Sequence, residues 1–169
     1  MIEIITDTIF HLYNEKISYV MHVLPNRQLG HLYFGPSLGH LSANDMDYLT
    51  KKENKSAGTV KFFENDGLFT LADRFQELPT YGSSDFREGA VTIFAEDVPL
   101  YVDFKVAEVE TFAGKERELA KPASFAEKTE SQSLRIMLID EQRQLKMEIT
   151  YTIFAGLGTI ARNQRITNL

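Results

Sequence analysis

The fold class is decided by residues 134–151, LRIMLIDEQRQLKMEITY. From Leu145 to Tyr151 every second residue is apolar, the period that places one face of a strand on a core and the other in water. A similar run covers Leu134–Leu138, and the polar segment Asp140–Gln144 between the two runs has the length of a hairpin loop. We therefore expect an antiparallel pair of strands here.

Short strand-like runs recur on both sides of this hairpin. They are separated by turn-forming residues such as Asn14 and Pro25, and Pro99 excludes a central strand at its position. In the longest run we expect a bulge before Val109. The further expected strands cover residues 9–12, 17–23, 29–34, 90–94, 101–112 and 160–166.

Helix signals are few. Asn44 or Asp45 is expected to cap a single turn from Met46 to Thr50, and residues 51–58 are expected to form an exposed loop. Many short strands with almost no amphipathic helix predict an all-β fold, a two-layer antiparallel β-sandwich with little helix. The 169 residues are the length of a single domain and are too few for a (β/α)₈ barrel.

Composition excludes several classes of partner and chemistry. A net charge of −6 opposes binding to nucleic acid or to anionic lipid. The absence of cysteine excludes disulfides, thiol catalysis and cysteine-ligated zinc. With no basic n-region and no long apolar run, the sequence predicts neither a signal peptide nor a membrane span, so we expect a cytoplasmic location.

No self-contained catalytic motif stands out. His11, His22, His31 and His40 lack the spacing of a chelating motif, so no metal is expected, and no phosphate-binding glycine loop or nucleophile elbow predicts a cofactor or a catalytic serine. Acidic pairs of the kind that glycoside hydrolysis needs all fall in expected turns, where acids are common solvated residues. These pairs are Asp45 with Asp47, Glu64 with Asp66, Glu96 with Asp97, and Asp140 with Glu141.

The segment in which turn-forming, aromatic and charged residues are most concentrated is 76–87, QELPTYGSSDFR. Its proline, glycine and serines predict a tight irregular loop. Two interpretations are open. Asp85 and Arg87 could brace the loop by pairing with each other or with the local backbone, or the rings of Tyr81 and Phe86 could contact a carbohydrate or a partner.

At this segment the chain resembles the N-terminal domain of glycoside hydrolase family 36, the bacterial α-galactosidases that cleave raffinose- and melibiose-type sugars. The resemblance extends over nearly the whole chain in ordered succession. Besides QELPTYGSSDFR it includes ISYVM at 17–21, LGHLYFG at 29–35, FTL at 69–71, Gly114-Lys115, ESQSL at 130–134, YTIF at 151–154 and Ile160-Ala161-Arg162.

The resemblance implies a β-supersandwich that precedes a catalytic barrel in a longer, retaining enzyme. The two catalytic aspartates belong to the barrel, so residues 1–169 are expected to be a single N-terminal domain with no catalytic residue of its own. Family members often carry an aspartate on an earlier loop that reaches a galactose, in an active site completed by oligomerisation. The nearest candidate for this substrate-binding residue here is Asp47, in a stretch that lacks a clear match to the family pattern.

The leading hypothesis is therefore the non-catalytic N-terminal domain of an α-galactosidase that hydrolyses terminal α-galactosyl residues of raffinose and melibiose. Its expected partners are the barrel of the same polypeptide, further copies in a homo-oligomer, and the galactosyl oligosaccharide of the parent enzyme. The alternative is a free-standing carbohydrate-binding β-sandwich that offers Tyr33, Tyr48, Tyr81 and Tyr101 as a sugar platform.

Overall fold

The structure, a computed structural model, describes residues 1–50, 69–82, 87–117 and 123–169. Apart from one α-helix, α1 (Ala43–Thr50), and a 3₁₀ turn at Leu71–Asp73, the regular elements of these residues are strands. The strands are β1 (Ile2–Thr6), β2 (Ile9–Tyr13), β3 (Ile17–Val23), β4 (Leu29–Pro36), β5 (Phe94–Ala95), β6 (Val98–Pro99), β7 (Lys105–Ala113), β8 (Ser131–Asp140), β9 (Leu145–Phe154) and β10 (Ile160–Asn168).

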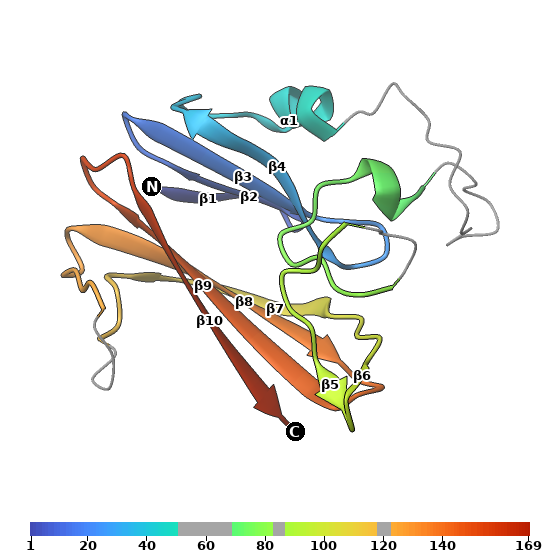
Figure 1. Cartoon of the computed structure of the whole chain (residues 1–169). Coiled ribbons are helices and arrows are strands. Elements are labelled where there is room, and N and C mark those ends of the chain that lie inside the picture. Colours follow the sequence, from blue (N-terminus) through green and yellow to red (C-terminus); the bar gives the residue numbers. More distant parts are fainter. Residues whose placement is uncertain (51–68, 83–86, 118–122) are drawn as a thin grey trace.

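Two antiparallel sheets pack face to face (Figure 1). The first sheet has the order β1-β2-β3-β4 and the second the order β10-β9-β8-β7, so each is a meander in which sequence neighbours are paired. Short turns suffice for such connections, which explains why turn-forming residues separate the strand-like runs. The expected all-β, two-layer antiparallel sandwich is confirmed.

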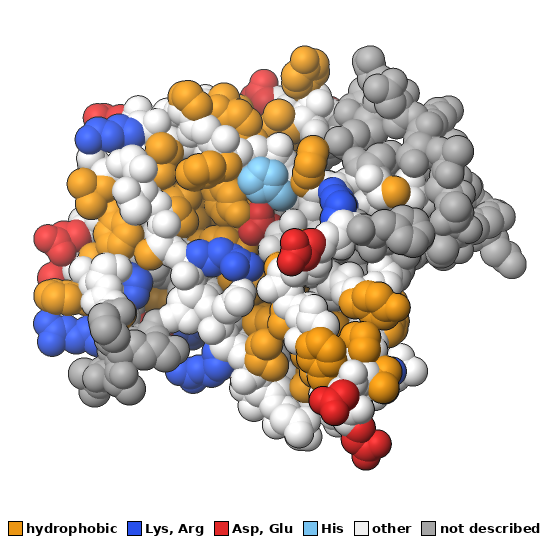
Figure 2. Space-filling view, in the orientation of Figure 1, with side chains coloured by type: hydrophobic (Ala, Val, Ile, Leu, Met, Phe, Trp, Pro, Cys, Tyr) orange, Lys and Arg blue, Asp and Glu red, His pale blue; other side chains and the backbone are white. Residues whose placement is uncertain are grey.

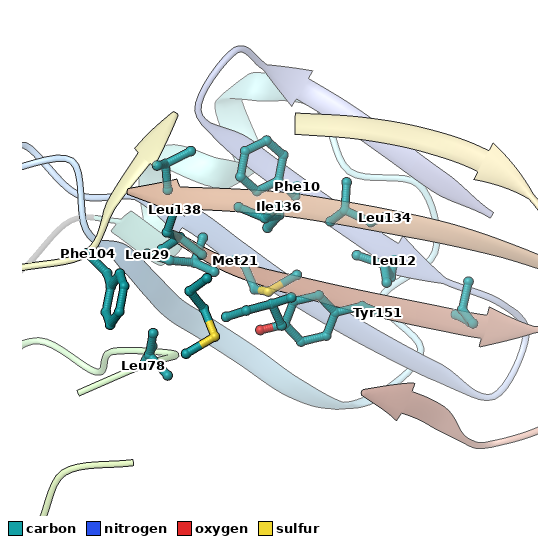
Figure 3. Packing of buried hydrophobic residues seen from close by; sticks show 14 of the residues in the cluster. Phe10, Leu12, Met21, Leu29, Leu78, Phe104, Leu134, Ile136, Leu138 and Tyr151 are labelled. Carbon is teal, nitrogen blue, oxygen red and sulfur yellow. The ribbon is translucent and has the colours of Figure 1, made fainter. Parts of the chain in front are cut away.

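The core lies between the two sheets and is built from the alternating residues of both (Figure 3). Phe10, Leu12 and Met21 come from the first sheet and are at most 1% exposed. Residues of the quoted hairpin face them, in the cross-strand pairs Leu134↔Tyr151, Ile136↔Ile149 and Leu138↔Met147. Each such side chain contributes about 1.5–3 kcal/mol when it leaves water, so this layer dominates the stability of the domain.

Hydrogen bonds join the two sheets at both ends of the sandwich. At one end the side-chain amide of Asn14 donates to the carbonyl oxygens of Phe154 and Leu157 at 2.9 and 2.7 Å. At the other end Arg27 and Val106 are joined twice, because the Val106 N–H donates to the Arg27 carbonyl and the Arg27 guanidinium donates to the Val106 carbonyl. The relative position of the sheets is thus fixed by polar groups as well as by the core.

The long run at 101–112 forms a strand only from Lys105 onward. Val102 and Phe104 are buried in the core, but the Asp103 N–H donates to the Asp140 carboxylate instead of to a neighbouring strand. Because a side chain, and not a neighbouring strand, accepts this backbone hydrogen bond, the regular strand begins only at Lys105. The expected bulge is present, because the pairing with β8 shifts register between Val106 and Glu108.

The helix differs from the prediction in length and in cap. It begins at Ala43 and has eight residues. Ser42 caps it: the Asp45 N–H donates to the Ser42 hydroxyl, and the Asp45 carboxylate accepts in return from the Ser42 N–H at 2.8 Å. This reciprocal pair is a capping box, so Asp45 contributes from the first turn and neither it nor Asn44 is the cap. The loop expected at 51–58 lies outside the described residues.

Two further elements were not expected. Residues Ile2–Thr6 form β1, which pairs with β2. The strand expected at 90–94 was wrong for residues 90–93, because only Phe94 is in a strand: it begins the minimal hairpin β5–β6, in which Phe94 pairs with Pro99 and Ala95 with Val98. Its two turn residues, Glu96 and Asp97, both have positive φ angles, 49° and 66°, as a type I′ turn requires.

Candidate functional site

The helix α1 carries Asp47, the nearest candidate for a substrate-binding residue. Met46 is buried against Ile9 and Val20, which face outward from the first sheet, so the helix covers the outer surface of that sheet (Figure 1). Asp47 and Tyr48 follow on the solvent side, and Tyr48 is 86% exposed. An exposed carboxylate beside an exposed aromatic ring is chemically suited to bind sugar hydroxyls and to stack on a sugar ring.

The acidic pairs considered in the sequence have other roles where the structure describes them. Asp45 accepts from the Ser42 N–H in the capping box of α1, and Glu96 and Asp97 form the tip of the β5–β6 turn. Asp140 accepts from the Asp103 and Arg143 N–H groups and shapes the β8–β9 turn, while Glu141 is exposed. The pair Glu64 and Asp66 lies outside the described residues.

A buried carboxylate in the segment QELPTYGSSDFR is surrounded by polar side chains. Residues 75–77 run along the free edge of β4: the His31 N–H donates to the Phe75 carbonyl and the Glu77 N–H to the Leu29 carbonyl. The next residue, Leu78, is buried in the core. This pairing inserts the Glu77 side chain between the two sheets, where it is only 5% exposed.

Both sheets supply donors to this carboxylate. Oε1 of Glu77 accepts from the Tyr19 hydroxyl at 2.5 Å and pairs with Nδ1 of His31 at 2.8 Å, and Oε2 accepts from the Tyr151 hydroxyl at 2.7 Å. Arg162 closes the cluster by donating to the Tyr151 hydroxyl and to the Glu77 carbonyl. We call these five residues the Glu77 cluster: Tyr19 on β3, His31 on β4, Glu77, Tyr151 on β9 and Arg162 on β10.

The electrostatics of the Glu77 cluster favour a carboxylate that stays ionised. Burial by itself raises the pKa of Glu77, but the hydrogen bonds from His31, Tyr19 and Tyr151 outweigh it and hold the pKa below its ordinary value. Burial and the neighbouring negative charge raise the pKa of Tyr19 and of Tyr151, so both hydroxyls remain donors. A carboxylate with both oxygens occupied by protein donors is a structural link between sheets rather than a general base or a nucleophile.

Arg87, at the end of the same segment, braces the loop through the backbone. Its guanidinium donates to the carbonyl oxygens of Leu71 and Arg74 at 3.0 and 2.5 Å. The backbone-bracing interpretation is therefore confirmed for Arg87. Asp85 and Phe86 lie outside the described residues.

The four histidines are not brought together. His31 belongs to the Glu77 cluster, and His40 pairs with Glu3 at 3.0 Å. His11 is fully buried, its Nε2 lies 3.0 Å from the Ser18 hydroxyl, and burial lowers its pKa to about 4. Among the described residues no group of three or more histidine and acidic side chains is placed to hold a metal ion.

The tyrosines proposed as a sugar platform are dispersed. Tyr33 uses its hydroxyl to donate to the Pro36 carbonyl. Tyr48 lies on α1, whereas Tyr81 and Tyr101 lie close to Gly82 at the far end of the molecule, where a Cβ on Gly82 would be 2.3 Å from the Tyr101 ring. The four rings thus do not share one surface.

Sequence reasoning did not identify the Glu77 cluster. Its members are separated by up to 143 positions, from Tyr19 to Arg162. One signal was present: Tyr19 and Tyr151 occupy positions in alternating runs, and a tyrosine hydroxyl at a core-facing position needs a buried acceptor. The sequence did not show which acceptor would meet both.

Comparison with known proteins places this arrangement in context. Residues 27–169 match the Glycosyl hydrolase family 36 N-terminal domain. The chain is 32% identical over 161 residues to the bifunctional α-galactosidase/sucrose kinase AgaSK of Mediterraneibacter gnavus, a match that covers 95% of this chain and 17% of that protein.

Solved structures agree. The galactosidase domain of AgaSK superposes with a TM-score of 0.84 at 30% identity, over 99% of this chain and 23% of that one. The α-galactosidase AgaA variant A355E D548N of Geobacillus stearothermophilus, in complex with raffinose, gives a TM-score of 0.82 at 28% identity, over 95% of this chain and 22% of that one. The chain thus spans about a fifth of the length of the relatives it matches. No helix within the described residues is long and apolar enough to cross a membrane.

Proposed function

The chain belongs to the glycosyl hydrolase family 36 N-terminal domain family, and from this membership we propose that it is the non-catalytic N-terminal domain of an α-galactosidase. The parent enzyme hydrolyses terminal α-galactosyl residues of oligosaccharides such as raffinose and melibiose. The observation that carries the proposal is the match along nearly the whole chain to α-galactosidases of which it represents about a fifth.

The carboxylates of the domain support a non-catalytic role. Glycoside hydrolysis requires two carboxyl groups about 5–10 Å apart on either side of the scissile bond, with room between them for sugar. The buried carboxylates Glu77 and Asp140 are instead occupied by donors of the domain itself. Within the described residues, the acids considered as pairs either belong to the capping box of α1, form turns or face solvent. These roles support the proposal that catalysis belongs to the rest of the parent enzyme.

The test compares the 169-residue chain with the full-length product of its gene, using p-nitrophenyl α-galactoside, melibiose and raffinose. We expect the full-length protein to release galactose and the isolated chain to show no activity above background. Hydrolysis by the isolated chain at a rate close to that of the full-length protein would overturn the proposal, as would a full-length protein without α-galactosidase activity.

Asp47 is proposed to contact the galactosyl substrate from the outer side of α1, in an active site of a neighbouring subunit of a cytoplasmic homo-oligomer. The solvent exposure of Asp47 and the adjacent ring of Tyr48 support this role. A hydrogen bond to a charged group contributes about 1.5–3 kcal/mol, so Asp47→Asn in the full-length protein should lower kcat/KM for raffinose about 10- to 100-fold.

The matched control is Glu15→Gln, which neutralises an exposed carboxylate in the turn between β2 and β3. It should leave kcat/KM unchanged. Equal kcat/KM values for Asp47→Asn and the unaltered protein would remove Asp47 from the substrate site without affecting the assignment of the domain.

A further inference from the structure

The β5–β6 hairpin leaves several apolar side chains uncovered. Residues 94–99 are all exposed, including Phe94 at 61% and Val98 at 62%. The preceding Val91 and Ile93 pack against the core, so the hairpin is anchored on one side and its outward side is apolar. A soluble domain rarely presents such a projecting apolar element to water without a partner.

Neighbouring residues extend this surface. Thr80 forms a bridge with Val91 and donates to the Val102 carbonyl at 2.8 Å, which fixes the segment containing Tyr81 beside the base of the hairpin. Tyr81 is 58% exposed and Tyr101 37% exposed. We call Tyr81, Phe94, Val98 and Tyr101 the hairpin patch. Figure 2 shows hydrophobic side chains gathered over the hairpin, with acidic side chains at its rim.

The end of β10 lies on the same side of the molecule. The Leu169 N–H donates to the Gln144 carbonyl at 2.8 Å, which ties the last residue to the β8–β9 turn. In that turn Arg143 donates to the Tyr101 carbonyl at 3.2 Å. One turn therefore connects Leu169 with a member of the hairpin patch, and in Figure 1 the C-terminus lies close to β5 and β6.

The relatives indicate that the parent protein has polypeptide outside this domain that could cover this surface. The family domain is N-terminal, and the matched region is only 17–22% of the first three relatives, so about four-fifths of each such protein lies outside it. A polypeptide that continues from Leu169 emerges beside the hairpin patch and has a short path back onto it. A hairpin of two-residue strands is not stable by itself in water, and here the packing of Val91 and Ile93 against the core anchors it.

We propose that the hairpin patch is the docking surface for the segment that follows residue 169 in the same polypeptide. This inference rests on the proposed function, because it requires a longer parent protein. Phe94 and Val98 enter an apolar depression of that segment, and Glu96 and Asp97 at the tip face basic groups at its rim.

The test uses the full-length product of the gene with Phe94→p-benzoylphenylalanine, a photo-crosslinking analogue of the same shape at its inner ring. Equal amounts of ¹⁴N- and ¹⁵N-labelled protein are mixed, irradiated and digested, and linked peptides are identified by mass spectrometry. We expect a link from position 94 to a residue beyond 169 in which both peptides carry the same isotope. Phe125→p-benzoylphenylalanine is the matched control, because Phe125 is 55% exposed but lies outside the patch. From position 125 we expect no link to a residue beyond 169.

Three results would overturn the docking proposal: no link from position 94, a link confined to residues 1–169, or a link that joins peptides of different isotope and so identifies a second copy as the occupant. Galactosidase activity is measured on the same preparation. Activity without the expected link overturns the docking surface alone, whereas the expected link without activity overturns the proposed function and leaves the docking surface supported.

Discussion

Two carboxylates of this domain, Glu77 and Asp47, show how burial separates structural from binding roles. Glu77 lies between the sheets, its side chain is 5% exposed, and Tyr19, His31 and Tyr151 occupy its oxygens. Asp47 lies on the outer side of α1, exposed to water. A buried charge must be satisfied by the protein itself, whereas an exposed one is available to a ligand at no cost in stability. The Glu77 cluster therefore belongs to the fold, and α1 is the place to look for substrate contact.

Removal of the buried charge should have the largest effect on stability. Glu77→Gln replaces an acceptor oxygen with an amide group that faces donors, so a tyrosine hydroxyl loses its partner. Hydrogen bonds to charged groups contribute about 1.5–3 kcal/mol, and we expect the free energy of unfolding to fall by about 2–4 kcal/mol. Urea denaturation followed by circular dichroism measures it. Glu96→Gln is the exposed control. Equal unfolding free energies for the two variants would contradict the structural role of the buried carboxylate.

The difference in unfolding free energy between the unaltered protein and Glu77→Gln should depend on pH. Because the hydrogen bonds hold the pKa of Glu77 below its ordinary value, the ionised carboxylate stabilises the fold fully above the ordinary carboxyl pKa of about 4.3. This contribution is lost as the pH falls through the lowered pKa of the folded state. The gap in unfolding free energy between the unaltered protein and Glu77→Gln should thus be constant from pH 7 to about 5 and narrow in more acidic solution. A gap that widens on acidification would contradict the assigned direction.

A smaller effect is expected at the cap of α1. Ser42→Ala removes the hydroxyl that accepts from the Asp45 N–H and donates to the Asp45 carboxylate. Loss of an N-cap of this kind costs about 1 kcal/mol. Ser42→Asp restores an acceptor for the Asp45 N–H but places two carboxylates together, so it should recover only part of the loss. Chemical denaturation distinguishes the two variants, and a neutral Ser42→Ala would show that Met46 alone holds the helix.

The smallest effect on stability should come from Asp47 itself. Its exposed carboxylate can be replaced in Asp47→Asn with a change in unfolding free energy of about 0.5 kcal/mol or less, as is usual for surface positions. The same variant is expected to impair galactoside hydrolysis by the full-length enzyme. A stability loss as large as that of Glu77→Gln would assign Asp47 a structural role and contradict the difference between the two carboxylates.

The period-two pattern of residues 134–151 was sufficient for the two-layer fold, because alternation is a local property that burial on one face enforces. Short-range signals also located the β8–β9 turn and the bulge in β7. They failed where a side chain hydrogen-bonds to the backbone of another residue. Asp140 captures the Asp103 N–H and delays β7, and Ser42, not Asn44 or Asp45, caps α1 because its hydroxyl and the Asp45 carboxylate satisfy each other.

By itself the sequence determined the net acidic charge and the strand periodicity, which depends on residues close along the chain. Only the tertiary structure decided the role of Glu77. Tyr19 is 58 positions and Tyr151 74 positions away from it, and they meet it because two separate sheets pack face to face. The packing of β5–β6 as an anchored, uncovered hairpin was likewise decided in three dimensions, since Val91 and Ile93 find the core while Phe94 and Val98 are left facing water.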